Sequence, residues 1–138
     1  MFKFLSENSL SLSFLVALTA TFGSLFFSEV AHFLPCKLCW YQRIAMYPQV
    51  ILLGIAAVKN DFSIRKYILP LSLIGLGVSI YHYLLQMSPI PLPCSDEVAN
   101  CALKQFAYFG YITIPLMAAT AFSLIIFLML ASSKNNKR

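Results

Sequence analysis

Hydrophobic and polar positions form long blocks along this chain. Four predominantly apolar stretches, at about 9–28, 39–58, 67–87 and 107–131, are separated by short segments that carry most of the charges. An α-helix rises about 1.5 Å per residue, so roughly 20 residues cross a hydrocarbon core about 30 Å thick. Each stretch therefore predicts a helix that is long enough to span a membrane.

The connections between these stretches are short. The connection formed by residues 59–66 is so short that it can join only two neighbouring helices that run antiparallel. We therefore predict an all-α membrane protein, a four-transmembrane-helix antiparallel bundle that forms one integral membrane domain over residues 1–138. A cleaved signal peptide is the alternative for the first stretch. Its apolar region would span about 7 to 15 residues, which is shorter than the uncharged run from Asn8 to Ser28.

The composition agrees with a membrane location. The chain is 59% hydrophobic and 11% charged, which leaves too few polar side chains to cover a soluble globule. The net charge of +5 raises the question of a nucleic-acid partner. The basic residues, however, sit in short clusters between apolar runs and form no stripe with interleaved aromatic residues. We therefore expect a lipid bilayer and no nucleic acid as partner.

The distribution of basic residues predicts the orientation. Seven lie at the termini and in the connection 59–66: Lys3, Lys59, Arg65, Lys66, Lys134, Lys137 and Arg138. The other two loops hold three: Lys37, Arg43 and Lys104. Loops rich in lysine and arginine usually lie on the cytoplasmic side of a membrane, so both termini are predicted to be cytoplasmic. We expect a multi-pass protein of the plasma membrane. The cysteine-bearing loops then lie on the extracytoplasmic face, where disulfides persist.

The candidate chemistry lies where a polar loop meets the second apolar stretch, in the sequence Cys36-Lys-Leu-Cys39-Trp-Tyr-Gln-Arg43. If a helix begins near Cys39, then Cys39 and Arg43 lie on one face about one turn apart, and a thiol and a fixed positive charge share one pocket. The helix N-terminus and the nearby cations favour the thiolate, the species that attacks disulfides. This pattern indicates redox chemistry. An interfacial anchor is the alternative role for Arg43.

A second cysteine pair follows in the outer loop between the third and fourth stretches. Cys94 and Cys101 have six residues between them, and a disulfide there would stabilise the fold by roughly 2.5 kcal/mol on the loop-entropy model. His82 lies near the end of the third stretch, at the same membrane face as Arg43. An ionisable residue at that depth is a functional candidate, and a hydrogen-bonded packing histidine is the alternative.

Several accounts of the four cysteines compete. Two structural disulfides are possible, but a Cys-x-x-Cys pair makes a strained staple and is more often redox-active or metal-bound. A zinc site lacks a second Cys-x-x-Cys pair, so we predict no metal. Haem attachment would need a histidine where Trp40 follows Cys39. Two redox pairs on one membrane face are best explained as an electron relay.

The motif from Cys36 to Arg43, followed by the second cysteine pair in the outer loop, resembles the DsbB family of disulfide-bond-forming membrane oxidoreductases. The short chain and the close spacing of Cys94 and Cys101 make it most similar to the compact BdbC branch. The resemblance covers essentially the whole chain. It implies an extracytoplasmic thioredoxin-like thiol oxidase, DsbA-like or BdbD-like, as the partner that the protein reoxidises.

The resemblance also implies roles for individual residues. Electrons would pass from Cys94 and Cys101 to Cys36 and Cys39, and then to a membrane quinone, either menaquinone or ubiquinone. Arg43, with Gln42 and His82, would belong to the quinone-binding site.

Two other functions compete with this one. A relative of vitamin K epoxide reductase would carry its Cys-x-x-Cys late in the chain, whereas here it opens the second stretch. A small four-span transporter or assembly protein with structural disulfides is the alternative from a different class. Proton-coupled transporters usually carry acidic residues inside their spans, and this chain has none there.

Overall fold

The computed structural model describes residues 2–30, 32, 37–87, 107–108 and 112–135. Its elements follow the chain in this order: α1 (Phe2–Glu7), α2 (Ser9–Glu29), α3 (Lys37–Lys59), the short 3₁₀ helix η1 (Phe62–Ile64), α4 (Arg65–Met87), strands β1 (Ala107–Tyr108) and β2 (Ile112–Thr113), and α5 (Ile114–Asn135). The two strands pair antiparallel. The described part of the chain is therefore almost entirely helical, as the sequence predicts.

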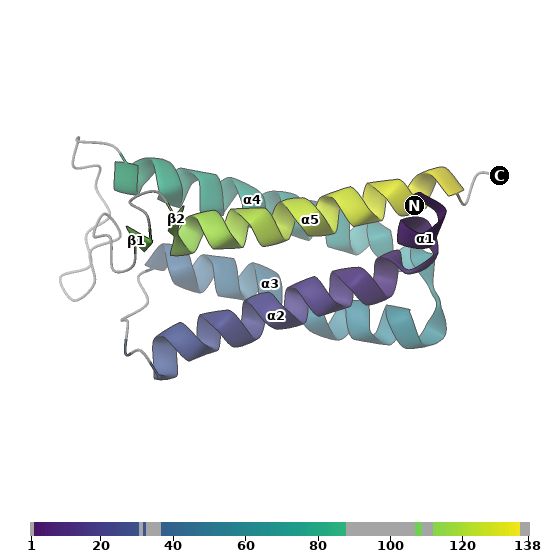
Figure 1. Cartoon of the computed structure of the whole chain (residues 1–138), viewed down its shortest axis with the longest axis horizontal. Coiled ribbons are helices and arrows are strands. Elements are labelled where there is room, and N and C mark those ends of the chain that lie inside the picture. Colours follow the sequence, from purple (N-terminus) through teal and green to yellow (C-terminus); the bar gives the residue numbers. More distant parts are fainter. Residues whose placement is uncertain (1, 31, 33–36, 88–106, 109–111, 136–138) are drawn as a thin grey trace.

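The four long helices lie side by side (Figure 1). α2 packs on α3, α3 on α4, α4 on α5, and α5 returns to contact α2. The short helix α1 packs against α5, so the chain begins beside the C-terminal end of α5. The first three apolar stretches of the sequence correspond to α2, α3 and α4. Their boundaries agree within about two residues, which is the uncertainty expected of helix ends.

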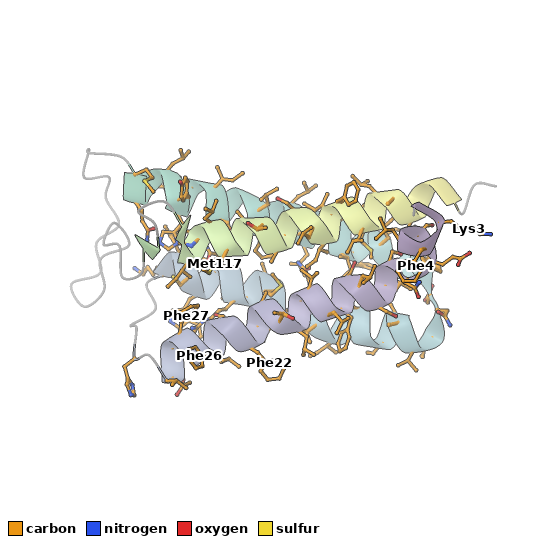
Figure 2. All side chains as sticks on the ribbon, viewed as in Figure 1. Lys3, Phe4, Phe22, Phe26, Phe27 and Met117 are labelled. Atoms are coloured by element: carbon orange, nitrogen blue, oxygen red, sulfur yellow. The ribbon has the colours of Figure 1, made fainter. Side chains whose placement is uncertain are left out.

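Three of these helices are long and apolar enough to cross a membrane, namely the stretches Ser9–Glu29, Phe62–Met87 and Ile114–Ser132. α3 has a similar length, but its polar residues lower its mean hydropathy. Large apolar side chains project outward from the helices, as Phe22 does in Figure 2. Such a surface suits lipid, whereas buried polar residues such as Gln49 and Ser72 face the interior of the bundle.

The fourth apolar stretch differs most from its prediction. Its first residues form β1 and β2, and α5 begins only at Ile114. Pro115 therefore lies in the first turn of α5, where its missing N–H costs no helical hydrogen bond. Residues 2–7 form the short helix α1, which the hydropathy pattern does not predict.

The connection between α3 and α4 is a tight turn. Asn60 adopts a positive φ of 52°, and Asp61 then caps η1 by accepting hydrogen bonds from the backbone N–H and the hydroxyl of Ser63. These bonds favour the ionised carboxylate and lower the pKa of Asp61. The turn joins antiparallel neighbours, as its length predicts.

The contact between α4 and α5 depends on one glycine. A Cβ added at Gly75 would lie 2.3 Å from Cζ of Phe122, a side chain that is 0% exposed in the core. Atoms of a real side chain do not approach this closely, so the ring occupies the space that the glycine leaves open. Gly77, on the same helix, has nothing within 4 Å of its added Cβ.

Gly75→Ala is therefore expected to destabilise the bundle by about 1–3 kcal/mol, because overpacking forces the Phe122 ring out of its position. The measurement is the SDS concentration at the unfolding midpoint in mixed micelles, followed by circular dichroism. Gly77→Ala is the matched control and should leave the midpoint close to that of the wild type. Equal shifts in the two variants would contradict the steric explanation.

Candidate active site

A cavity of about 560 Å³ lies between α2, α3 and α5, towards the end of the bundle where α3 and α5 begin. This volume falls within the range of about 300–1,000 Å³ that is usual for small-molecule sites. Its walls are largely apolar: Leu15, Val16 and Phe27 from α2, Met46 from α3, and Met117, Phe122 and Leu124 from α5. The cavity therefore suits a ligand that is mostly hydrophobic.

One face of α3 supplies three of the side chains that line the cavity. Cys39, Arg43 and Tyr47 follow one another at intervals of four residues, and all three line the cavity. Residues four apart lie on the same face of a helix, about one turn from each other. Because α3 begins at Lys37, the half-buried Cys39 lies in its first turn. The prediction that Cys39 and Arg43 share one pocket is confirmed.

The guanidinium group of Arg43 is held from α2. Its Nε donates to the hydroxyl oxygen of Ser24 at 2.9 Å, and its Nη2 donates to the backbone carbonyl of Ser24 at 3.1 Å. The guanidinium carbon also lies 5.4 Å from the centre of the Trp40 ring, within cation–π range. A guanidinium has five N–H donors, so the two bonds to Ser24 leave others for a ligand.

The hydroxyl groups of three threonines along the cavity are bonded within their own helices. Thr19, Thr21 and Thr120 each donate to the backbone carbonyl four residues earlier, at 2.8 Å. Their O–H donors are therefore already used. The hydroxyl of Tyr47 also lines the cavity and has no hydrogen-bond partner among the described residues, so it adds to the polar recognition offered by Cys39 and Arg43.

His82 lies behind the cavity, on α4. It is 1% exposed, and its Nδ1 lies 3.3 Å from Nε2 of Gln42, while its Nε2 lies 3.3 Å from Nε2 of Gln86. Both glutamines approach the ring with their amide Nε2 atoms, which donate, and a neutral imidazole accepts at one nitrogen only, so the ring accepts a hydrogen bond from one of these amides. Gln42 itself lines the cavity, and it therefore connects His82 to the site.

His82→Leu is expected to destabilise the protein by about 1–3 kcal/mol, because it removes the hydrogen-bond partner of buried glutamine amides. The SDS unfolding midpoint is the measurement. His32→Leu is the control, since His32 is exposed beyond the end of α2. A His82→Leu variant as stable as the control would show that this network does not hold α3 to α4.

The described residues bring together Cys39, Gln42 and Arg43 at the cavity, with His82 one contact away. Cys36, Cys94 and Cys101 lie outside the described residues. Sequence reasoning did not find Ser24, because nothing in its surroundings marks a contact with a helix 19 residues away. Tyr47 could have been predicted, because it lies four residues after Arg43 and therefore on the same face of the helix.

The helices and the cavity define a small helical protein of membrane type with a cysteine thiol and a cation on one cavity. The chain belongs to the DsbB family: the family described as "Disulfide bond formation protein DsbB" matches residues 6–132. The resemblance drawn from the cysteine motif is thus confirmed.

Curated relatives agree with this membership. The chain is 48% identical to "Disulfide bond formation protein C" of Bacillus subtilis (strain 168), over 85% of this chain and 86% of the relative. It is 48% identical to a "Probable disulfide formation protein" of Oceanobacillus iheyensis, over 90% and 87% of the two chains. A "Probable disulfide formation protein" of Coxiella burnetii (strain CbuK_Q154) is 43% identical over 99% and 96%. No solved structure matches the chain.

Proposed function

We propose that this protein is a membrane thiol:quinone oxidoreductase that generates disulfides. In this proposal it reoxidises an extracytoplasmic thioredoxin-like thiol oxidase and passes the electrons to a membrane quinone. Membership of the DsbB family and relatives named for disulfide formation support the disulfide-generating role. The proposal that a quinone accepts the electrons is supported by the position of Cys39 and Arg43, which together line a largely apolar cavity.

The residues of the cavity fit a quinone headgroup. A quinone is a flat, mainly hydrophobic ring with carbonyl oxygens that accept hydrogen bonds. The apolar walls suit the ring, and the N–H groups of Arg43 that Ser24 does not use suit a carbonyl oxygen. The bound quinone would accept two electrons and two protons from the Cys36–Cys39 dithiol and become a quinol, while the two sulfurs form a disulfide.

The chain's own groups would prepare this exchange. Cys39 lies in the first turn of α3, where the helix N-terminus and the charge of Arg43 favour its thiolate. Arg43 would also stabilise negative charge that develops on a carbonyl oxygen. Gln42 lines the same cavity, and His82 orients it through their hydrogen bond. In this site His82 is a positioning residue, since Gln42 lies between it and the cavity.

The supply of electrons completes the proposal. The reduced partner would attack the Cys94–Cys101 disulfide at Cys94, and Cys101 would then exchange with Cys36. This route requires four membrane spans, cytoplasmic termini and both cysteine pairs on the extracytoplasmic face of the plasma membrane. The excess of basic residues at the termini and in the connection between α3 and α4 supports this orientation.

The test uses the full chain purified in detergent. A reduced DsbA-like thiol oxidase is added together with a short-chain ubiquinone or menaquinone analogue, and quinone absorbance is followed alongside the thiol content of the partner. Loss of quinone absorbance that matches partner oxidation, one quinone per disulfide, is the expected result. Partner oxidation without quinone reduction, or no reaction with either quinone, would overturn the proposal.

A further inference from the structure

In the part of the chain that the structure describes, one residue of another helix holds the guanidinium of Arg43. Among the described residues, both acceptors that bind its guanidinium belong to Ser24 of α2, one on the side chain and one on the backbone. We propose that Ser24 is a positioning residue that fixes the guanidinium of Arg43 over the cavity and beside Cys39. The expected effect of Ser24 on quinone binding rests on the proposed function. The expected effect of Ser24 on the thiol of Cys39 does not involve quinone.

The two bonds fix the guanidinium in direction as well as in position. Nε and Nη2 lie on the same edge of the planar group, so two acceptors on one residue determine both the plane and its rotation. The N–H groups of Nη1 and the second N–H of Nη2 are then left for a ligand. A lysine at position 43 would present a point charge without this two-donor edge, and it would not be oriented by Ser24.

Ser24 also differs from the other hydroxyl residues of the cavity wall. The hydroxyls of Thr19 and Thr21, on the same helix, donate to carbonyls of α2 itself. The hydroxyl oxygen of Ser24 instead accepts a hydrogen bond from α3. An interaction between helices at this place connects the α2 wall of the cavity to its α3 wall.

Loss of the Ser24 hydroxyl removes one of the two acceptors. The carbonyl contact to Nη2 remains, but the guanidinium is free to turn about it and to shift towards Trp40, its aromatic neighbour at 5.4 Å. The charge is then held less firmly beside Cys39 and a ligand carbonyl. We therefore expect a lower thiolate fraction at Cys39 and weaker binding of the quinone.

Cys39 alkylation tests this without quinone. In full-length chains whose other three cysteines are serine, the rate of Cys39 alkylation by iodoacetamide is measured at fixed pH. Ser24→Ala is expected to lower this rate about threefold, as the thiolate fraction falls with a less firmly held cation. Ser24→Thr keeps the hydroxyl and should restore the rate. Ser11→Ala, which removes an exposed hydroxyl elsewhere on α2, is the matched control.

Quinone kinetics give the second readout. In the chain with all four cysteines, Ser24→Ala is expected to raise KM for the quinone analogue about tenfold, the effect of losing one hydrogen bond to a charged group, while kcat changes less. If Ser24 acts through Arg43, adding Ser24→Ala to Arg43→Gln should change neither readout further. Additive effects in the double variant would overturn the inference, and so would a Ser24→Ala variant that matches the wild type.

A failure of this inference is distinct from a failure of the proposed function. A wild-type protein that reduces quinone, combined with a neutral Ser24→Ala, rejects the positioning role alone. A wild-type protein that does not reduce quinone rejects the proposed function. The alkylation rates then decide by themselves whether Ser24 holds Arg43 beside Cys39.

Discussion

Replacing Cys39 with serine is expected to lower thiol-dependent quinone reduction by at least roughly 1,000-fold, because a serine hydroxyl neither ionises near neutral pH nor forms a disulfide. Cys39 is the cysteine that the described residues place beside Arg43 and on the cavity. The measurement is the initial rate of quinone absorbance loss with reduced partner in excess.

Serine has nearly the same shape as cysteine, so the fold of this variant should be unchanged. Its SDS unfolding midpoint and helical circular dichroism, compared with those of the wild type, provide the control. A Cys39→Ser variant that keeps more than a tenth of the wild-type rate would show that electrons reach the quinone by a route that bypasses the cavity.

Arg43→Gln is expected to lower kcat/KM for the quinone by about 100-fold, the usual effect of removing a donor that stabilises developing negative charge. Arg43→Lys should fall between this variant and the wild type, because it keeps the charge but loses the two-donor edge that Ser24 holds. The measurement is the rate of quinone reduction over a range of quinone concentrations.

Lys66→Gln is the control for the loss of one positive charge. Lys66 is exposed in the first turn of α4, near the turn that joins α3 to α4 and away from the cavity. It should retain wild-type kinetics. A loss in this variant as large as in Arg43→Gln would attribute the effect to net charge or folding rather than to the site.

Hydropathy predicted the helices well but missed the start of α5. Residues 107–113 are largely apolar, and a short apolar run does not distinguish a strand from the beginning of a helix. The strands β1 and β2 depend on pairing with each other, which is a contact between segments. A hydropathy window does not contain such a contact, so the predicted helix extended too far towards the N-terminus.

Spacing along one helix was the most reliable guide to the site. Cys39 and Arg43 are four residues apart, and helical geometry alone placed them on one face. The position of His82 required only that the third stretch run antiparallel to the second, which its short connection imposes. That arrangement brings His82 close to Gln42, but it does not determine which atoms of the two side chains form the hydrogen bond.

By itself, the sequence determined the four long helices apart from the start of α5, their suitability for a membrane, and the common face of α3 on which a thiol and a cation lie. These properties follow from composition and from the helical repeat, which are local. Only the tertiary structure decided that Ser24 holds Arg43, that Phe122 fills the space at Gly75, and that α2, α3 and α5 enclose the cavity. Each of these depends on the register between helices, which is set by packing among residues far apart in the chain.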